Sequence, residues 1–301
     1  MEPSILITGG SGFVGQAIIR SGLFKNPIYI SRREISGVKN SKISELNTTI
    51  DYKDILRNVD VIIHCAGIAH NNDKPNFSHN SFNADFTQYF ANQAVKSGVK
   101  QFILLSTAKV LGEETSCCKP FTNESIGSPK TAYSKSKLLA EECLISECEK
   151  STMAFTIIRP PLIYGLEPKG NLKTLTKLIK YSIPLPVARV RNCRSMVSVD
   201  DLVEFIYRCS FDKKSWGKKY LISDGIDYST EYLVKLMAKN QKLKAKIYWF
   251  PQTILKFIFH MIGKNNLYAS IYGSFKLEVD TTQNMLGWKP SRKLADYENT
   301  K

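Results

Sequence analysis

The cysteine content of this 301-residue chain excludes two common ways of building a protein or a site. Its seven cysteines are an odd number, and no two of them form a Cys-x-x-Cys pair. Such a set is not typical of a disulfide framework or of a tetrahedral zinc site. We therefore expect a reducing, cytoplasmic environment and no bound metal ion.

Long uninterrupted apolar runs are also missing. An apolar segment begins at residue 4, so we expect no signal peptide. The most apolar stretch, residues 247–262, contains Pro251, Lys256 and His260 and is shorter than the roughly 20 residues that a membrane span needs. We expect no stable membrane insertion. Helical spacing after the proline predicts an amphipathic helix packed on the core, with peripheral membrane contact as the alternative. The residues in question are Ile254, Leu255, Phe257, Ile258, Met261 and Ile262.

Acidic residues are too few to balance the basic ones. The chain has 27 Asp and Glu against 42 Lys and Arg, a formal charge of +15. An excess of this size fits nucleic acid, anionic membrane surfaces or phosphate-bearing ligands. However, the lysines are spread along the chain, and no basic run is interleaved with aromatic residues. We interpret the charge as a Lys-rich background and expect no nucleic-acid partner.

The first half of the chain alternates short apolar runs with helical patterns. The pattern predicts strands at 5–8, 28–31, 59–67, 101–107 and 155–161, and helices near 14–22, 82–97 and 131–149. Strands that are apolar throughout, rather than at every second residue, indicate a parallel sheet covered on both faces. The predicted fold class is therefore α/β, a Rossmann-type doubly wound parallel sheet whose ligands bind beyond the carboxyl ends of the strands.

A glycine-rich turn follows the first strand and opens the first helix. Gly9, Gly12 and Gly15 permit a tight turn, close approach of a pyrophosphate to the backbone, and close helix packing. The helix N-terminus adds free N–H groups and a positive dipole end. We predict that this turn binds a dinucleotide. Its contact residues are expected to be Gly9, Ser11, Gly12, Phe13, Val14 and Gly15.

The end of the second strand bears on which dinucleotide binds. A preference for NAD is typically marked there by an acidic residue that binds the ribose hydroxyls. This chain instead has Arg32 and Arg33, whose guanidinium groups suit a 2′-phosphate. We favour NADP, with NAD as the alternative. If the two arginines bind no phosphate, they are solvated surface residues.

We predict a dinucleotide-binding domain over residues 1–165 and a smaller substrate lobe over residues 166–301. Residues 193–224 are expected to return to the first domain, with 218–224 as a further strand of the main sheet. After residue 161 the predicted strands and helices no longer alternate regularly, which is why the boundary is placed near there.

Tyr133 and Lys137 lie one helical turn apart near the start of a long predicted helix. Reduction of a ketone needs an acid for the oxygen, and oxidation of the alcohol needs the matching base. A free phenol has a pKa of about 10, and the nearby charges of Lys137 and an oxidised nicotinamide would lower it. Thr107, at the end of the fourth strand, can hydrogen-bond the same substrate oxygen. These three residues form the predicted catalytic set.

In this order the motifs resemble the extended short-chain dehydrogenase/reductase family over nearly the whole chain. The matching segments are TGGSGFVG (8–15), HCAG (64–67), LLSTAKVLG (104–112), YSKSK (133–137) and RPPLIYG (159–165). Later segments (RSMVSVDDLV, YLISDG, LGWKP) are similar to UDP-sugar 4-epimerases and 4-ketoreductases. The closest similarity is to the UDP-quinovosamine-type 4-reductases of surface polysaccharide synthesis.

The resemblance implies further site residues and a homodimer. Glu45 and Leu46 would border the adenine, and Asn171 and Arg194 would meet the nucleotide diphosphate. His70 either lines the sugar pocket or is structural. The other implied cofactor contacts are Ala66, Gly67, Asn83 and Pro160, and the other implied substrate contacts are Lys109 and Leu172.

Two departures from the family pattern bear on the reaction. Leu111 replaces the Tyr of the usual Val-Tyr-Gly, and Lys109 precedes it, as in the hexosamine 4-reductases. The second phosphate-binding Arg of many 4-epimerases has no counterpart around Gly273. We therefore expect reduction of a 4-keto group on a UDP-linked, N-acetylated 6-deoxy-hexose.

Three alternatives stay open. The first is a UDP-glucose or UDP-N-acetylglucosamine 4-epimerase that holds NAD tightly. The second is a non-catalytic dinucleotide-binding regulator, although such proteins typically lose the Tyr or the Lys. The third is a lipid or steroid ketone reductase, which the apolar 250s would suit.

Overall fold

The structure is a computed structural model and describes residues 2–35, 38, 41–43, 46–68, 81–116, 118–165 and 170–298. Within these ranges, the side chains of residues 41–43, 81, 170, 171, 297 and 298 are not described. His70 and Glu45 lie outside the described residues.

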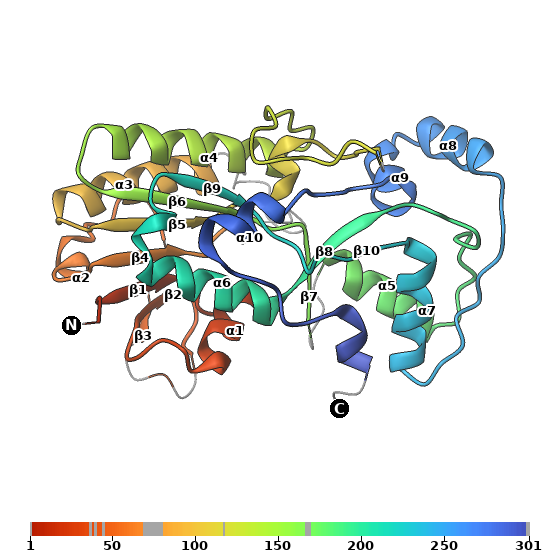
Figure 1. Cartoon of the computed structure of the whole chain (residues 1–301), viewed down its shortest axis with the longest axis horizontal. Helices are drawn as coiled ribbons and strands as arrows, with labels where there is room; N and C mark the ends of the chain where they lie inside the picture. The colour runs from red at the N-terminus through yellow and green to blue at the C-terminus, as the bar shows by residue number, and fades with distance from the viewer. Residues whose placement is uncertain are drawn as a thin grey trace.

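Each central strand buries apolar side chains on both of its faces, as the continuous apolar runs require. In β1 (Ile5–Thr8), Ile5 and Ile7 pack with α1 (Phe13–Ser21) and α6 (Val199–Phe211). Leu6 points to the opposite face, towards α3 (Phe86–Lys96) and α4 (Ala132–Glu149). Figure 1 shows these two pairs of helices on opposite sides of the sheet.

The main sheet has seven strands in the order β3-β2-β1-β4-β5-β6-β9, and all of its pairs are parallel. Order and direction confirm the doubly wound Rossmann-type fold. Besides β1, the strands are β2 (Ile28–Ser31), β3 (Ser41–Ile43), β4 (Val61–His64), β5 (Gln101–Leu105), β6 (Ala154–Arg159) and β9 (Lys218–Leu221). The short helix α2 (Lys53–Leu56) precedes β4. The sequence pattern did not indicate β3, because three residues with one apolar side chain carry no strand periodicity.

A second lobe follows β6. It contains a three-stranded sheet of β7 (Leu162–Tyr164), β8 (Arg194–Ser198) and β10 (Asp227–Tyr228). Its helices are α5 (Gly170–Lys180), α7 (Thr230–Asn240), α8 (Gln252–Met261) and α9 (Asn265–Tyr272). β8 therefore lies in the second lobe's sheet, and β9 lies at the edge of the main sheet. We keep the division near residue 165 as a proposal.

The C-terminal segment returns across the first lobe and is held by a buried carboxylate. After α10 (Asp280–Leu286), the backbone N–H groups of Ser291 and Arg292 donate to Asp201 at 2.9 and 3.1 Å. Trp288 is buried in the same region, edge-to-face against Phe205 of α6. These contacts fasten the end of the chain to the helix that covers one face of the main sheet.

The predicted packing of the apolar helix at 254–262 is wrong in most of its residues. Leu255 is buried and Phe259 is half-buried against the second lobe, but the other five apolar residues named above are exposed. The helix lies at the rim of a small lobe, so only one narrow face meets a core. Among the described residues, no helix is long and apolar enough to cross a bilayer.

His64 lies beneath the glycine-rich turn in a fully buried position. Its Nδ1 is 2.8 Å from the hydroxyl of Thr8 and its Nε2 is 3.4 Å from that of Thr87. The ring packs among aromatic side chains, including those of Phe86 and Phe102. Burial, with a smaller effect from the charge of Lys137, lowers the pKa of His64 from 6.5 to about 3.

This pKa predicts a pH dependence of stability. Between pH 6.5 and 3, the unfolded chain protonates His64 and the folded chain does not, so the free energy of unfolding falls as the pH falls. The contribution is about 1.4 kcal/mol per pH unit. Urea unfolding from pH 7 to pH 4 should give a shallower slope for His64→Gln than for the wild type. His260→Gln, at an exposed histidine, is the control and should keep the wild-type slope. Equal slopes for all three proteins would contradict a neutral, buried imidazole.

Candidate active site

The turn between β1 and α1 leaves no room for side chains at Gly9 and Gly15. Gly9 has a φ of +76°, and a Cβ there would lie 2.7 Å from the amide nitrogen of Ala66. A Cβ on Gly15 would lie 2.3 Å from the carbonyl oxygen of Gly9. Gly9 N–H donates to Ile30 and Gly12 N–H donates to Gly9. The glycines therefore bring β1, β4 and the start of α1 within backbone contact.

The start of α1 is exposed and carries no side-chain cap. Gly12 is the N-cap and has no side-chain cap, and the first turn contains no acidic residue. Ser11 and Gly12 are exposed, Phe13 is half-buried, and Val14 is buried in the core beneath. An uncapped, exposed helix start behind a glycine turn fits the diphosphate of a dinucleotide.

The residues expected to bind the adenosine half lie beside this turn. Ser31, the last residue of β2, is buried and hydrogen-bonds within the turn that follows, whereas Arg32 and Arg33 are exposed. Leu46 is buried in the core cluster beneath β1 and β4. The two guanidinium groups are thus accessible at the end of β2, where a ribose would lie in this fold.

β4 leads into a tightly packed corner around Gly67. A Cβ on Gly67 would lie 3.2 Å from Nζ of Lys137 and 3.3 Å from Oδ1 of Asn83. The Asn83 side chain accepts from the N–H of Ile68 at 2.9 Å and donates to the Oγ of Ser136 at 3.0 Å. Ala66 is buried next to the glycine turn. Asn83 therefore holds the segment after β4 against the start of α4.

Lys137 is a buried ammonium with a defined acceptor. Its Nζ donates to the carbonyl oxygen of Leu105, the last residue of β5, at 2.8 Å. Burial lowers its pKa from 10.5 to about 8, against smaller opposing effects of Cys65 and Glu141. Near pH 7 it therefore carries its charge in a site shielded from water.

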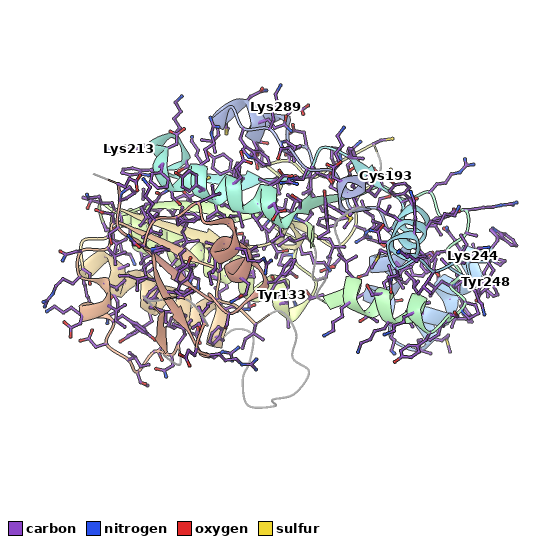
Figure 2. The ribbon with its side chains drawn as sticks, turned by 90° about the horizontal axis from the view of Figure 1, so that it is seen from below. Tyr133, Cys193, Lys213, Lys244, Tyr248 and Lys289 are labelled. Carbon is purple, nitrogen blue, oxygen red and sulfur yellow. The ribbon has the colours of Figure 1, made fainter. Side chains whose placement is uncertain are left out.

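Tyr133 precedes Lys137 by one turn of α4 and is half-buried. Burial raises the pKa of its phenol from 10 to about 12, so the group is neutral at physiological pH. The helix begins at a capping box formed by Thr131 and Ser134, which places Tyr133 in its first turn. Figure 2 shows Tyr133 where the two lobes meet.

Thr107 lies just beyond β5 and is buried. It caps the 3₁₀ helix Ala108–Leu111, and its Oγ1 accepts from the N–H of Lys109 at 3.3 Å. Pro160, also buried, accepts a hydrogen bond from the N–H of Ala108 at 2.9 Å. The ends of β5 and β6 thus support the residues predicted to contact the substrate and the nicotinamide.

A buried network that the sequence analysis missed holds α4 in place. Glu141 accepts from Nε and Nη2 of Arg159 at 3.0 and 2.6 Å and also accepts from the hydroxyl of Ser106. Glu141 and Arg159 are both buried. In the sequence, the only sign of this ion pair is that Glu141 follows Lys137 by one helical turn. The sign is weak, because only tertiary packing brings Arg159 of the neighbouring strand to Glu141.

The second lobe and the segment after β5 supply charged groups. Arg194 is largely buried, and its Nη1 donates to the carbonyl oxygen of Gly273 at 2.8 Å. Burial lowers the pKa of Arg194 from 12.5 to about 10, while Glu113 and Glu114 act in the opposite direction. Lys109 pairs with Glu113 at 2.7 Å. Sequence analysis did not single out Glu113, whose Oε1 is buried with no hydrogen-bond partner among the described residues.

Two predicted substrate residues lie in the first turns of α5. Leu172 is buried in the core cluster of the second lobe with Tyr164 and Met196, so its side chain packs beneath the lobe surface. Asn171 belongs to α5, and its side chain lies outside the described residues. In the described part of the chain, no group of three or more His, Cys, Asp or Glu side chains could hold a metal ion.

Comparison with known proteins agrees with this arrangement. The model of the NAD dependent epimerase/dehydratase family matches residues 5–222. A UDP-glucose 4-epimerase from Vibrio cholerae is 33% identical, over 98% of this chain and 93% of its own length. The N-acetyl-α-D-glucosaminyl-diphospho-ditrans,octacis-undecaprenol 4-epimerase of Escherichia coli O157:H7 is 26% identical, over 87% of this chain and 78% of its own length.

A solved structure shares the fold at much lower sequence identity. The UDP-N-acetylglucosamine 4-epimerase from Bacillus cereus superimposes with a TM-score of 0.76 at 17% identity. The match covers 99% of this chain and 97% of that protein. Both lobes therefore follow an arrangement found in another protein.

The geometry of the turn predicts the effect of Gly12→Val. Gly12 has an extended backbone (φ −78°), and a Cβ there would meet only the Gly9 carbonyl oxygen, at 3.0 Å. The chain should therefore fold, but the new side chain would fill the space in front of the start of α1. We expect NAD affinity, measured by titration calorimetry, to fall at least tenfold with little change in melting temperature.

Arg20→Ala, on the exposed end of the same helix, is the matched control and should bind NAD normally. Wild-type NAD affinity in a folded Gly12→Val protein would show that the cofactor does not use this turn.

Proposed function

The chain belongs to the NAD dependent epimerase/dehydratase family, as its motifs led us to expect, and we propose that it interconverts C4 epimers of a UDP-linked hexose. The observation that carries this proposal is its match to the UDP-glucose 4-epimerase at 33% identity across nearly the whole of both chains. The chain also keeps the Tyr, the Lys and the Thr that carbonyl–alcohol chemistry requires. The sequence analysis had favoured 4-keto reduction and kept 4-epimerisation as an alternative. We now favour epimerisation and keep reduction as the second candidate.

We propose that Tyr133 exchanges a proton with the oxygen on C4. A nicotinamide cofactor held by the glycine-rich turn and Lys137 would supply reversible hydride exchange with C4 and, in its oxidised form, a positive charge near the phenol. With a pKa of about 12 in the free chain, the phenol is protonated at physiological pH and therefore in the form that donates. Removing a proton from the C4 hydroxyl requires that pKa to fall by several units.

Lys137 supplies part of that decrease. Its ammonium is buried one helical turn from the phenol, and a buried positive charge favours the phenolate strongly because water does not screen it. The Leu105 carbonyl restrains the ammonium, so the charge stays fixed while the proton moves. Since its pKa is about 8, we expect activity to decline as the pH rises through that value.

Thr107 and the charged groups of the second lobe would position the sugar nucleotide. The Thr107 hydroxyl can donate to the C4 oxygen while it accepts from Lys109 N–H. Arg194 suits the diphosphate because, among the described residues, its half-buried guanidinium donates only to backbone carbonyl oxygens. The unpaired oxygen of Glu113 is a candidate acceptor for a sugar hydroxyl or N–H group.

The second candidate is reduction of a 4-keto group on a UDP-linked, N-acetylated 6-deoxy-hexose. Leu111 and Lys109 favour it, because buried Leu111 cannot supply the hydroxyl of the usual Tyr, and Lys109 is already paired with Glu113. The two reactions differ in the fate of the cofactor, since epimerisation returns the hydride and reduction consumes it.

The cofactor of the family is NAD, as its name states, and a preference for NADP stays a prediction. It rests on Arg32 and Arg33, which are exposed where a 2′-phosphate would lie. We further propose a homodimer in the cytoplasm, a compartment supported by the free state of the cysteines that the structure describes.

The arginine pair can be tested directly. In the double variant Arg32→Ala/Arg33→Ala, NADP affinity should fall about tenfold or more, because two charge-assisted contacts are lost, and NAD affinity should change little. Fluorescence titration of the apoprotein with both nucleotides measures this. Equal NADP affinity in variant and wild type would remove the arginines from the site.

Tyr133→Phe tests the enzymatic proposal. We expect turnover of UDP-glucose and UDP-N-acetylglucosamine to fall at least a thousandfold, with NAD affinity unchanged, because only the proton-transfer group is removed. Products are identified by NMR, and nicotinamide absorbance shows whether the reaction has a net redox change. Wild-type turnover in the variant would overturn the mechanism. Activity only with a UDP-4-keto sugar and stoichiometric loss of NADH or NADPH would replace epimerisation by reduction.

A further inference from the structure

α8 presents apolar side chains on two faces. Leu255 and Phe259 point into the second lobe, where Phe259 packs edge-to-face with Tyr268 at 5.8 Å between ring centroids. The opposite side carries what we call the outer α8 face. It consists of Trp249, Ile254, Phe257, Ile258, Met261 and Ile262, which are between 42% and 68% exposed.

The spacing of the outer α8 face is that of one helical stripe. Ile254, Phe257, Ile258 and Met261 follow each other at steps of three, one and three residues. Trp249, 59% exposed, lies just before the helix begins. Because α8 is already fixed to the lobe through Leu255 and Phe259, the outer face is surplus to the packing of the lobe itself.

The second lobe also holds the excess positive charge of the protein. Residues 168–199 contain seven Lys and Arg, and residues 232–277 contain eight, and neither segment contains an Asp or a Glu. The fifteen basic residues of these two segments equal the formal net charge of the whole chain, +15. The positive charge is therefore concentrated in the second lobe. This differs from our interpretation in the sequence analysis, which treated it as a background spread along the chain.

The two acid-free segments fold together around α8. Leu185 N–H donates to the carbonyl oxygen of Lys246 at 2.8 Å, and Tyr248 N–H donates to that of Leu185 at 3.0 Å. Lys242, Lys244 and Lys246 are exposed on the strap that leads to Trp249. Figure 2 shows Lys244 and Tyr248 at the end of the second lobe that is distant from Tyr133.

We propose that the outer α8 face and its surrounding lysines dock the protein on an anionic lipid bilayer. A helix lying in the interface buries an apolar face about 5–10 Å into the headgroup region and keeps its lysines at the anionic surface. Tryptophan and long basic side chains are the residues favoured at that depth. α8 has ten residues, too few to span a bilayer but enough for the stripe to lie along its surface.

Charge decides between a bilayer and a second copy of this chain. In a two-fold symmetric contact, the same patch meets itself, so two acid-free, lysine-rich segments would face each other and repel. A nucleic acid would be attracted by the lysines but would leave the apolar stripe in water. An anionic bilayer satisfies both features at once. The proposal does not depend on which sugar the active site accepts.

The test is co-sedimentation of the full chain with phosphatidylcholine vesicles, with and without about one third phosphatidylglycerol. The wild type should sediment with the anionic vesicles and remain in the supernatant with phosphatidylcholine alone. Phe257→Glu/Met261→Glu should abolish sedimentation. Lys242→Gln/Lys244→Gln/Lys246→Gln should weaken it on the order of a hundredfold, since each lysine near an anionic surface contributes about fivefold.

Ile126→Glu is the matched control, because it places the same acid at a 90% exposed apolar residue of the first lobe. It should sediment like the wild type. Melting temperature and NAD affinity should be unchanged in all variants, which shows that each is folded.

A wild type that stays in the supernatant with anionic vesicles would overturn the proposal. So would equal binding to both kinds of vesicle, because the lysines would then have no role. A wild-type dimer that Phe257→Glu/Met261→Glu converts to a monomer, without lipid binding, would identify a second copy as the occupant instead. None of these results bears on the epimerase assay, so the two proposals fail separately.

Discussion

The hydrogen bond from the ammonium of Lys137 to the carbonyl oxygen of Leu105 is the constraint on which the site depends. A buried ammonium is costly unless its donors have acceptors, so α4 must lie where Lys137 reaches the end of β5. That requirement sets the position of Tyr133 one turn earlier on α4. The next turn is held by Glu141, which pairs with Arg159 of β6. One helix is thereby fixed against two strand ends, at the edge where a doubly wound sheet binds its ligands.

Two titratable groups that interact with Lys137 stay neutral at physiological pH. His64 is buried between two threonine hydroxyls and stays neutral, since burial and the charge of Lys137 both lower its pKa. Cys65 is held as a thiol, because burial raises its pKa to about 12. Lys137 therefore lies near two groups that stay neutral at physiological pH. In the mechanism proposed above, the charge of a bound nicotinamide would change the proton affinity of the Tyr133 phenol strongly, because little water would be present to screen it.

The second lobe has an apolar stripe and a positive charge that its own packing does not require. Its own core uses one narrow face of α8, yet the helix carries a second apolar stripe and is bordered by acid-free segments. Surplus apolar surface costs solubility unless something covers it, and surplus charge of one sign indicates a partner of the other sign. The first lobe shows neither an exposed apolar stripe nor an excess of one charge to this extent. The two lobes thus differ in charge and apolar surface as well as in topology.

The sequence by itself determined the main fold and the identities of the candidate reacting groups. Uniformly apolar strands such as residues 5–8 can be buried only in a sheet covered on both faces, and the glycine turn and the Tyr133–Lys137 spacing are local signals. Tertiary structure alone decided the rest. The Glu141–Arg159 pair, the unpaired oxygen of Glu113 and the outward stripe of α8 all depend on which segments meet. Helical periodicity reports that a face is apolar, but only the packed neighbours determine whether that face is covered.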